Sequence, residues 1–302
     1  MAKNEVFKMN IIVTIPAYNE ENSIGNVVRD IKNVMDQAKY SYKVLVIDDG
    51  SKDKTAEAAK KAGAVVYSHP YNYGLAETFR TEIKKCLELN ADIIVHIDAD
   101  GQYKAYEIPK LIKEVENGYD LVLGSRFLGK IEHMPLLKRL GNKAFSKVIS
   151  NITNVKISDG QTGFRAFNKN VAKLGIISNH TYTQEQIIRV VRNKFKIKEV
   201  PVYFGRRDGK SRLISNPFEY AMKAWTNILR VYRDYEPLRF FGYTGSLFLV
   251  SGILIGLWLV YNFIKTGIVG HIPLTILSTL LVVVGIQVIL FGFFADMNRK
   301  NE

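Results

Sequence analysis

The chain has a single cysteine, Cys86, among its 302 residues. One thiol can form neither an internal disulfide framework nor a cysteine-based zinc site, so both are excluded. We expect Cys86 to pack in the core as a small apolar residue. The opening stretch MAKNEVFKMN also lacks the apolar run of a secretory signal, which predicts an N-terminus that stays in the cytoplasm.

The sequence also lacks the glycine-rich loops that cradle phosphates. Neither GxGxxG nor GxxxxGKS/T occurs, which disfavours a dinucleotide-dependent oxidoreductase and a P-loop ATPase. The five histidines show no metal-ligand spacing. His96 stands within the apolar run IIVHI and is expected to be a core residue.

Acidic residues are outnumbered. The 42 Lys and Arg residues against 29 Asp and Glu give a formal net charge of +13. The segment from Leu238 onward contributes +2 through four basic and two acidic residues, which leaves +11 on residues 1–237. Such an excess predicts an anionic partner, namely nucleic acid, phospholipid headgroups or a phosphorylated substrate. Composition alone leaves these three open.

Charged residues are absent from two long runs near the C-terminus, Phe240 to Phe263 and Ile272 to Phe294. A membrane-spanning helix needs roughly 20 apolar residues, so the two runs predict a transmembrane hairpin within residues 238–302. Basic residues flank its outer ends, in RVYRDYEPLR before the first run and MNRK after the second. The positive-inside rule then predicts an integral membrane protein with two spans, with both termini and the large N-terminal part of the chain in the cytoplasm.

Residues 215–237 precede the hairpin and carry apolar side chains at helical spacing. These are Phe218, Met222, Trp225, Leu229 and Tyr232, with Lys223, Arg230 and Arg233 among them. The pattern predicts an amphipathic juxtamembrane helix. The helix either lies in the headgroup layer or packs against the soluble domain, and the sequence leaves both open.

Strand and helix patterns alternate over the first 130 residues. Short β-branched runs, NIIVTI, YKVLVI, AVVYS and DIIVHI, are separated by helical stretches at about 22–38, 54–62 and 76–89. This alternation predicts an α/β domain, residues 1–214, with a doubly wound, mostly parallel sheet. Ligands bind such sheets at the carboxyl ends of the strands, and there the sequence places PAYNE, DDGS and DADGQ.

DADGQ supplies two carboxylates, Asp98 and Asp100, one residue apart at the end of an apolar strand. In an extended segment both point to one side, where hard cations such as Mg²⁺ or Mn²⁺ prefer oxygen ligands shared with substrate phosphates. A nucleoside diphosphate is the natural co-ligand. The alternative is an ordinary turn, since turns are rich in aspartate. In DDGS, Asp49 either holds a nucleotide or belongs to a turn before a helix cap.

Six motifs, taken in order, carry a resemblance to a known family. They are PAYNE, VIDDGSKDKT, DADGQY, LGSRF, DGQTGFRAF and EVPVYFGRRDGKSRL, over about residues 10–215. The sequence resembles the family 2 glycosyltransferases, and within them the dolichyl-phosphate mannose synthase type, which makes polyprenyl-phosphate monosaccharides. The resemblance implies an A-type glycosyltransferase fold and inverting transfer of one sugar from a nucleotide sugar to a dolichyl or other polyprenyl phosphate.

The resemblance also implies roles for individual residues. It assigns nucleotide contacts to Pro16, Tyr18, Glu20, Asp49, Asp98, Ala99 and Gln102, and Mg²⁺ or Mn²⁺ to Asp98 and Asp100. It assigns the acceptor phosphate to Arg126, Lys138, Arg207 and Arg212, and the catalytic set to Asp100, Arg126 and Arg207. The family often has arginine where Lys138 stands and lysine where Arg212 stands. These differences keep the charge but change the hydrogen-bond geometry.

The chemistry of the implied reaction is consistent with this set. A lipid phosphate oxygen is already ionised near neutral pH, so it needs no strong general base. Two anionic substrates and a departing nucleoside diphosphate need positive charge instead, from a metal and an arginine cluster. The expected partners are therefore a nucleotide-sugar donor, a lipid phosphate acceptor and membrane lipid, with no nucleic acid and with oligomerisation left open.

Three alternatives compete with this interpretation. A processive polysaccharide synthase carries Gln-x-x-Arg-Trp, whereas Gln186 to Val190 read QIIRV, and two spans are too few for a polymer channel. A non-catalytic membrane scaffold predicts loss of the metal carboxylates, which are present. GDP-mannose is the alternative donor to the favoured UDP-sugars.

Glu185 lies within TYTQEQII, which predicts the start of a helix. Its side chain either orients acceptor groups or caps that helix.

Overall fold

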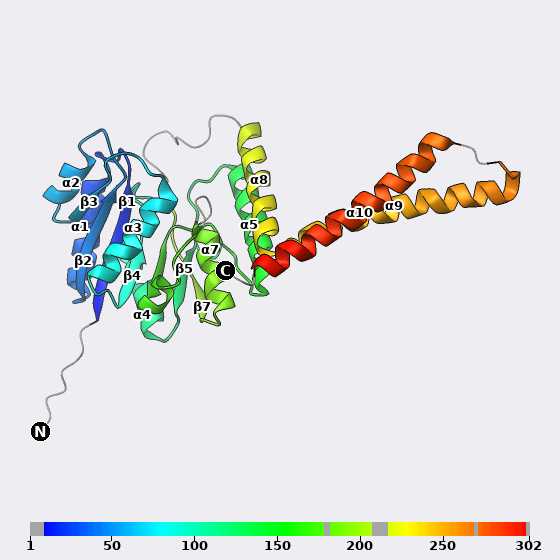
Figure 1. Cartoon of the computed structure of the whole chain (residues 1–302). Coiled ribbons are helices and arrows are strands. Elements are labelled where there is room, and N and C mark those ends of the chain that lie inside the picture. Colours follow the sequence, from blue (N-terminus) through cyan, green and yellow to red (C-terminus); the bar gives the residue numbers. More distant parts are fainter. Residues whose placement is uncertain (1–8, 178–181, 207–216, 269–270, 300–302) are drawn as a thin grey trace, which may run out of the picture. The chain divides into compact units, whose positions relative to one another are not determined.

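The computed structural model describes residues 9–177, 182–206, 217–268 and 271–299 (Figure 1). Arg207 and Arg212 lie outside these described residues. The chain separates into two compact units, Met1–Ala221 and Met222–Glu302.

The first unit contains a seven-stranded mixed sheet in the order β3-β2-β1-β4-β6-β5-β7. The strands are β1 (Asn10–Ala17), β2 (Ser41–Asp48), β3 (Val65–Ser68), β4 (Ile93–His96), β5 (Leu121–Ser125), β6 (Arg165–Asn168) and β7 (Ile197–Pro201). Strand β6 runs antiparallel to both β4 and β5, and the other pairings are parallel. The predicted α/β domain with a mostly parallel sheet is confirmed.

Helices cover both faces of this sheet. They are α1 (Ile24–Gln37), α2 (Thr55–Lys61), α3 (Leu75–Glu88), α4 (Ile108–Glu116), α5 (Leu136–Thr153), α6 (Lys169–Ala172) and α7 (Tyr182–Arg192), with a short 3₁₀ turn at Ala105–Glu107 before α4. Strand β1 is buried along seven of its eight residues. This is expected for a parallel strand with helices on both sides, and it explains the nearly continuous apolar run.

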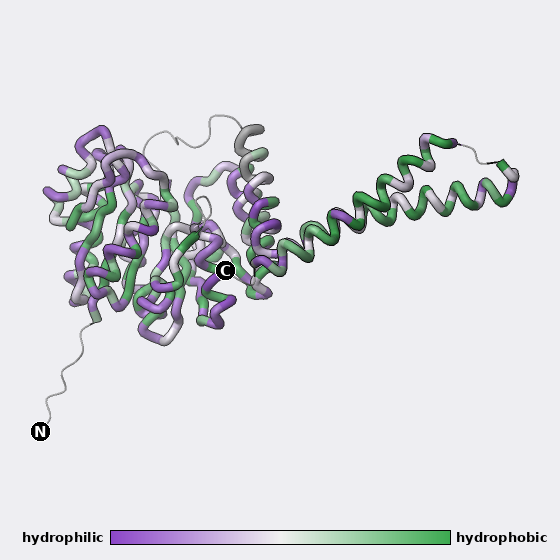
Figure 2. Tube along the Cα trace, viewed as in Figure 1, coloured by the Kyte–Doolittle hydropathy of each residue, from purple (hydrophilic) through white to green (hydrophobic). Residues whose placement is uncertain are grey.

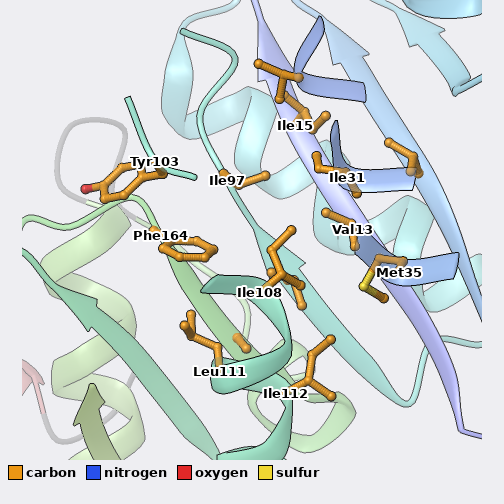
Figure 3. Close-up of a cluster of buried hydrophobic side chains, with 14 of the residues drawn as sticks. Val13, Ile15, Ile31, Met35, Ile97, Tyr103, Ile108, Leu111, Ile112 and Phe164 are labelled. Atoms are coloured by element: carbon orange, nitrogen blue, oxygen red, sulfur yellow. The ribbon is translucent and has the colours of Figure 1, made fainter. Parts of the chain in front are cut away.

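Alternate residues of the central strands face two different layers of the core. On one face, Val13 and Val95 pack with apolar side chains of α1 and α4, such as Ile31 and Leu111 (Figure 3). On the other face, Phe79 of α3 packs against strand side chains, including the ring of Phe167 on β6. Two filled faces hold the strands in place and fix the positions of the loops at their carboxyl ends.

The second unit contains the helices α9 (Pro237–Thr266) and α10 (Ile272–Arg299), and α8 (Pro217–Tyr235) spans the boundary between the units. α9 and α10 are long and apolar enough to cross a membrane, and only 6% and 11% of their apolar windows are buried. A core helix of a soluble protein would be mostly buried. Figure 2 shows hydrophobic residues along nearly all of both helices. The two expected apolar helices are therefore present.

Small residues bring α9 and α10 together. A methyl group added at Gly245 would lie 2.7 Å from the carbonyl oxygen of Gly285, and one at Gly252 would lie 2.9 Å from that of Ser278. The Ser278 hydroxyl donates a hydrogen bond of 2.7 Å to the carbonyl of Gly252. Close backbone approach through glycine is a common way to pack helices in lipid, where the hydrophobic effect does not drive them together.

Candidate functional site

The loops after β1 and β2 form one surface at the carboxyl end of the sheet. The two strands pair in parallel, so their ends lie side by side. Three hydrogen bonds of 2.8 Å join the loops, from Asn19 N to Ser51 Oγ, from Glu20 N to Thr55 Oγ1 and from Lys52 N to Asn19 Oδ1. The predicted nucleotide contacts Pro16, Tyr18 and Glu20 all belong to β1 or to this loop.

Asp49, at the end of β2, is buried and organises the loop that follows β3. Its Oδ1 lies 2.8 Å from Nδ1 of His69 and accepts a hydrogen bond of 2.9 Å from the backbone N–H of Tyr73. Its Oδ2 accepts one of 2.9 Å from the N–H of Gly74. The His69 and Tyr73 rings stack with centroids 4.5 Å apart. Asp49 therefore shapes this edge of the site, and its nucleotide contact stays a prediction.

Asp98 and Asp100 follow β4 and form the acidic centre of the site. Asp98 is half-buried, and a methyl group added at Gly163 would lie 2.8 Å from both of its carboxylate oxygens. Burial raises the pKa of Asp98, and the charge of Asp100 raises it further, while His96 and Arg126 act in the opposite direction. Between the two carboxylates, Ala99 is buried. The two predicted carboxylates are therefore close enough for the charge of Asp100 to raise the pKa of Asp98.

A divalent cation fits this pair of carboxylates as part of a shared site. Among the described residues, no group of three or more His, Cys, Asp or Glu side chains could hold a metal ion by itself. Asp98 and Asp100 supply hard oxygen donors, and their mutual repulsion is what a bound cation would relieve. Mg²⁺ commonly binds one or two carboxylates and completes its shell with water and substrate phosphates. The donor set therefore suits Mg²⁺ or Mn²⁺ together with a diphosphate.

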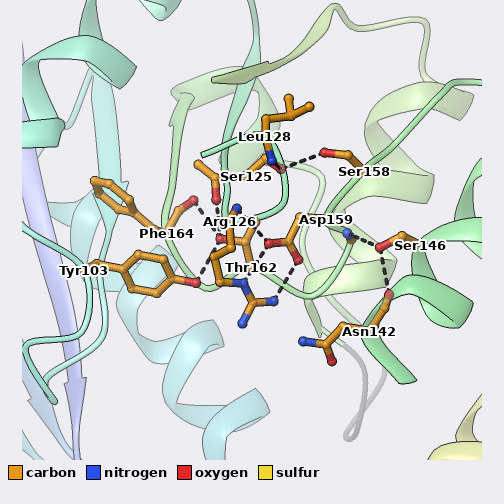
Figure 4. A network of polar contacts seen from close by, with 12 residues as sticks. Tyr103, Ser125, Arg126, Leu128, Asn142, Ser146, Ser158, Asp159, Thr162 and Phe164 are labelled. Carbon is orange, nitrogen blue, oxygen red and sulfur yellow. Dashed lines mark hydrogen bonds and ion pairs between the residues drawn. The ribbon is translucent and has the colours of Figure 1, made fainter. Parts of the chain in front are cut away.

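Arg126, directly after β5, is buried in a bidentate ion pair with Asp159 (Figure 4). Its Nε and Nη2 donate to the two carboxylate oxygens at 2.7 Å each, and its backbone N–H donates to the same carboxylate at 3.0 Å. Its guanidinium also lies over the ring of Phe204, 5.3 Å from the centroid. Asp159 thus fixes Arg126 and occupies two of its donors. Nη1 has no hydrogen-bond partner among the described residues.

The loop after Asp100 is tied to the segment that follows β7. The side-chain Nε2 of Gln102 donates a hydrogen bond of 3.0 Å to the backbone carbonyl of Gly205. The backbone carbonyl of Gln102 accepts one of 2.9 Å from the backbone N–H of Gly205. Tyr103 is buried and its hydroxyl lies 3.1 Å from that of Thr162. The Gln102 side chain therefore holds backbone in place, and this segment leads toward Arg207.

The remaining predicted residues occupy different elements. Lys138 lies in the first turn of α5 and is half-buried. Glu185, in the first turn of α7, is buried; it accepts from the Ile177 N–H at 2.8 Å and from Nε of Arg189 at 2.7 Å. These bonds give Glu185 a structural role in joining α7 to the preceding segment.

Several residues of the site carried no assignment from the sequence. Asp159 and Gly163 both stand in the motif DGQTGFRAF, but their partners Arg126 and Asp98 are far away along the chain. His69 follows β3 and became recognisable only through its contact with Asp49. The one signal that the sequence offered for Asp159 was an acidic residue within the motif DGQTGFRAF.

Comparison with known proteins places this chain in a family. Residues 12–175 match the description "Glycosyl transferase family 2", and residues 220–299 match "Glycosyltransferase family 2 C-terminal transmembrane region". The Haloferax volcanii protein named dolichyl-phosphate hexose transferase is 31% identical over 224 residues, which cover 74% of this chain and 93% of that protein.

Two further proteins bear on the fold and the site. A Methanococcus voltae protein named UDP-N-acetylglucosamine–dolichyl-phosphate N-acetylglucosaminyltransferase is 32% identical over 219 residues, covering 64% of this chain and 84% of that protein. Glucosyl-3-phosphoglycerate synthase from Mycobacterium tuberculosis, solved with Mn²⁺, uridine diphosphate and phosphoglyceric acid, has a TM-score of 0.57 at 19% identity. The match covers 74% of this chain and 78% of the other. That likeness shows the A-type fold.

Proposed function

Because this chain belongs to glycosyl transferase family 2, we propose that it transfers one sugar from a nucleotide sugar to dolichyl phosphate or another polyprenyl phosphate. One observation carries the proposal: a single chain contains both the Asp98–Asp100 site and two apolar helices long enough to cross a membrane. The names of two relatives, one from Haloferax volcanii and one from Methanococcus voltae, each include a dolichyl-phosphate acceptor.

The donor side of the site would use the carboxyl ends of β1, β2 and β4. The loops around Tyr18, Glu20 and Asp49 would receive the nucleoside, and Asp98 with Asp100 would receive Mg²⁺ or Mn²⁺ with the diphosphate. When bound, the cation would offset the charge that develops on the departing nucleoside diphosphate. The solved relative that contains Mn²⁺ and uridine diphosphate supports this pairing of ligands.

The acceptor side would use basic residues to bring a second anion close. Arg126 is already fixed by Asp159, so little conformational entropy would be lost when it binds a phosphate. Lys138, Arg207 and Arg212 would complete the set. An ionised lipid phosphate oxygen would attack the sugar carbon from the side opposite the nucleotide, which inverts the configuration at that carbon.

The donor is proposed to be a UDP-sugar, with GDP-mannose as the alternative. The name of the Methanococcus voltae relative includes UDP-N-acetylglucosamine. The proposal also places the site and both termini in the cytoplasm, because basic segments flank the two apolar helices.

A reconstituted transfer assay tests the function. The detergent-purified full chain is incubated with a polyprenyl phosphate and a panel of UDP- and GDP-sugars, with and without EDTA. Formation of a lipid-linked sugar from one donor, lost on chelation, supports the proposal. Nucleotide release without a lipid product would contradict the lipid acceptor, and no turnover with any donor would favour a non-catalytic scaffold.

Asp100→Ala provides the matched variant for this assay. The side chain is half-buried in a loop, so we expect the protein to stay folded while transfer is abolished. Full activity in this variant would remove Asp100 from the proposed metal site.

A further inference from the structure

Six polar side chains lie side by side in the core, on the face of the sheet that α3 covers. Thr14 pairs with His96 in the β1–β4 register, and His96 pairs with Arg165 in the β4–β6 register, so the three form a row. We call these residues the buried polar layer: Thr14, Glu82, His96, Arg165, Tyr182 and Gln186. Each of the six is at most 6% exposed. A polar row of this kind is unusual between apolar helices and an apolar sheet.

The layer contains every unpartnered buried side-chain atom found among the described residues. These atoms are Thr14 Oγ1, Glu82 Oε1, Arg165 Nε and Gln186 Nε2. An unpaired buried polar group lowers the stability of the fold, and well-packed apolar residues often replace buried charges without loss of stability. The layer therefore lowers stability, and such local conflicts are expected at functional sites.

Glu82 fixes the ring of His96 within this layer. Nδ1 of His96 lies 2.7 Å from Oε2 of Glu82. The ring of Phe79 meets the imidazole edge-on, with centroids 5.2 Å apart. The second nitrogen, Nε2, lies 4.0 Å from Oδ1 of Asp98 and 3.5 Å from the hydroxyl of Tyr182. One nitrogen is thus anchored by Glu82, and the other lies between the Tyr182 hydroxyl and the carboxylate of Asp98.

Asp98 is in this way confined from two directions. The backbone of Gly163 lies close against its carboxylate oxygens, as the position of an added methyl group shows. His96 approaches from inside the core. A cation site needs its carboxylate ligands in one orientation, and neighbouring groups supply that orientation.

We propose that His96, held by Glu82, is a positioning residue that orients Asp98 for the divalent cation; this rests on the proposed function. Residues that hold metal ligands in place commonly change metal affinity about 10- to 100-fold when replaced. The buried polar layer thereby contributes to the cation site, although it lowers the stability of the fold.

The decisive variant replaces the pair together, as Glu82→Leu with His96→Phe. Removing both partners leaves neither side of the Glu82–His96 contact unpaired, so the double variant should unfold at the same temperature as wild type or higher. Its dissociation constant for Mn²⁺ should rise at least tenfold. The readout is the electron paramagnetic resonance signal of free Mn²⁺, titrated into detergent-purified full chain with uridine diphosphate at one fixed pH.

Two single variants complete the test. Glu82→Gln keeps an oxygen that can accept from His96, so it should retain most of the Mn²⁺ affinity. Phe79→Leu alters the apolar side of the same ring, and it should lower the unfolding temperature while leaving Mn²⁺ affinity unchanged.

The outcomes separate this inference from the function that it rests on. Tight Mn²⁺ binding by wild type, with equal affinity in the double variant, would overturn the role of His96 and leave the proposed function intact. Absence of saturable Mn²⁺ binding in wild type with either uridine diphosphate or guanosine diphosphate would overturn both. An equal loss of Mn²⁺ affinity in Phe79→Leu and in the double variant would assign the effect to packing and overturn the inference.

Discussion

Gly163 leaves room for the carboxylate at the centre of the site. A methyl group there would lie 2.8 Å from both oxygens of Asp98, so the carboxylate would have to move. Misplacement of a reacting group by about 1 Å can cost roughly 100-fold in rate. We expect Gly163→Ala to lower kcat for sugar transfer about 100-fold, measured in the reconstituted assay, with an unfolding temperature close to that of wild type.

Gly25→Ala is the matched control for this change. Gly25 lies in α1, and a methyl group there would make an ordinary contact of 3.7 Å with Arg29. Alanine is also the better helix former, so this variant should keep full activity. A wild-type rate in Gly163→Ala would show that the orientation of Asp98 is not important for transfer.

Single residues could be singled out from the sequence where chemistry and local structure coincided. Asp98 and Asp100 were recognisable because an apolar strand leads directly into them. Asp159 and Gly163 were not, because each acts on a residue that only the folded sheet brings near. His96 was predicted to be a core residue and is fully buried, but its polar partner Glu82 lies on another element.

Among the elements, the end of β5 is held to the segment before β6 by one buried ion pair. Removing Asp159 would leave the guanidinium of Arg126 buried and without its carboxylate. Breaking a buried pair in this way costs about 3–5 kcal/mol. We expect Asp159→Ala to lower the free energy of unfolding of the first unit by that amount. Alkylation of Cys86 across a denaturant series measures it, because Cys86 lies in α3 and is buried.

The double change Arg126→Met with Asp159→Leu is the comparison. It removes both charges, so it should cost less stability than Asp159→Ala alone. A smaller loss in the single variant than in the double variant would mean that Arg126 does not depend on Asp159 for its burial.

The two apolar helices make a second prediction at the same scale. A side chain at Gly245 would meet the backbone of α10, whereas nothing lies within 4 Å of a methyl group at Gly242. Overpacking typically costs about 1–3 kcal/mol. Gly245→Leu should therefore lower the unfolding temperature of the hairpin in detergent, followed by fluorescence of Trp258 on α9. Gly242→Leu should leave it unchanged, and equal effects of both would place the contact between α9 and α10 elsewhere.

The early elements were predictable because their patterns are local. The apolar runs that became β1, β2, β3 and β4 and the helices between them appear where the sequence indicated. The antiparallel direction of β6 was not predictable, since its four residues carry no signal for direction. That direction is decided by pairing with β4 on one side and β5 on the other, and both pairings join distant parts of the chain.

For the whole molecule, orientation in the membrane can be measured with cysteines placed by design. The natural Cys86 is fully buried, and burial raises the pKa of its thiol well above the usual range. Thiolate is the reactive form, so native Cys86 should react very slowly with maleimides. A single added cysteine then reports its own position without background from the rest of the chain.

Lys61→Cys and Ile268→Cys are the two positions to compare. Lys61 is exposed at the end of α2, and Ile268 is 70% exposed between α9 and α10. In sealed vesicles with the cytoplasmic face outward, an impermeant maleimide should label Lys61→Cys at once and Ile268→Cys only after detergent is added. The positive-inside rule dictates this order, because basic residues flank the outer ends of the hairpin. The reverse order would place the catalytic unit on the far side of the membrane, and labelling of both before detergent would mean that the hairpin does not span it.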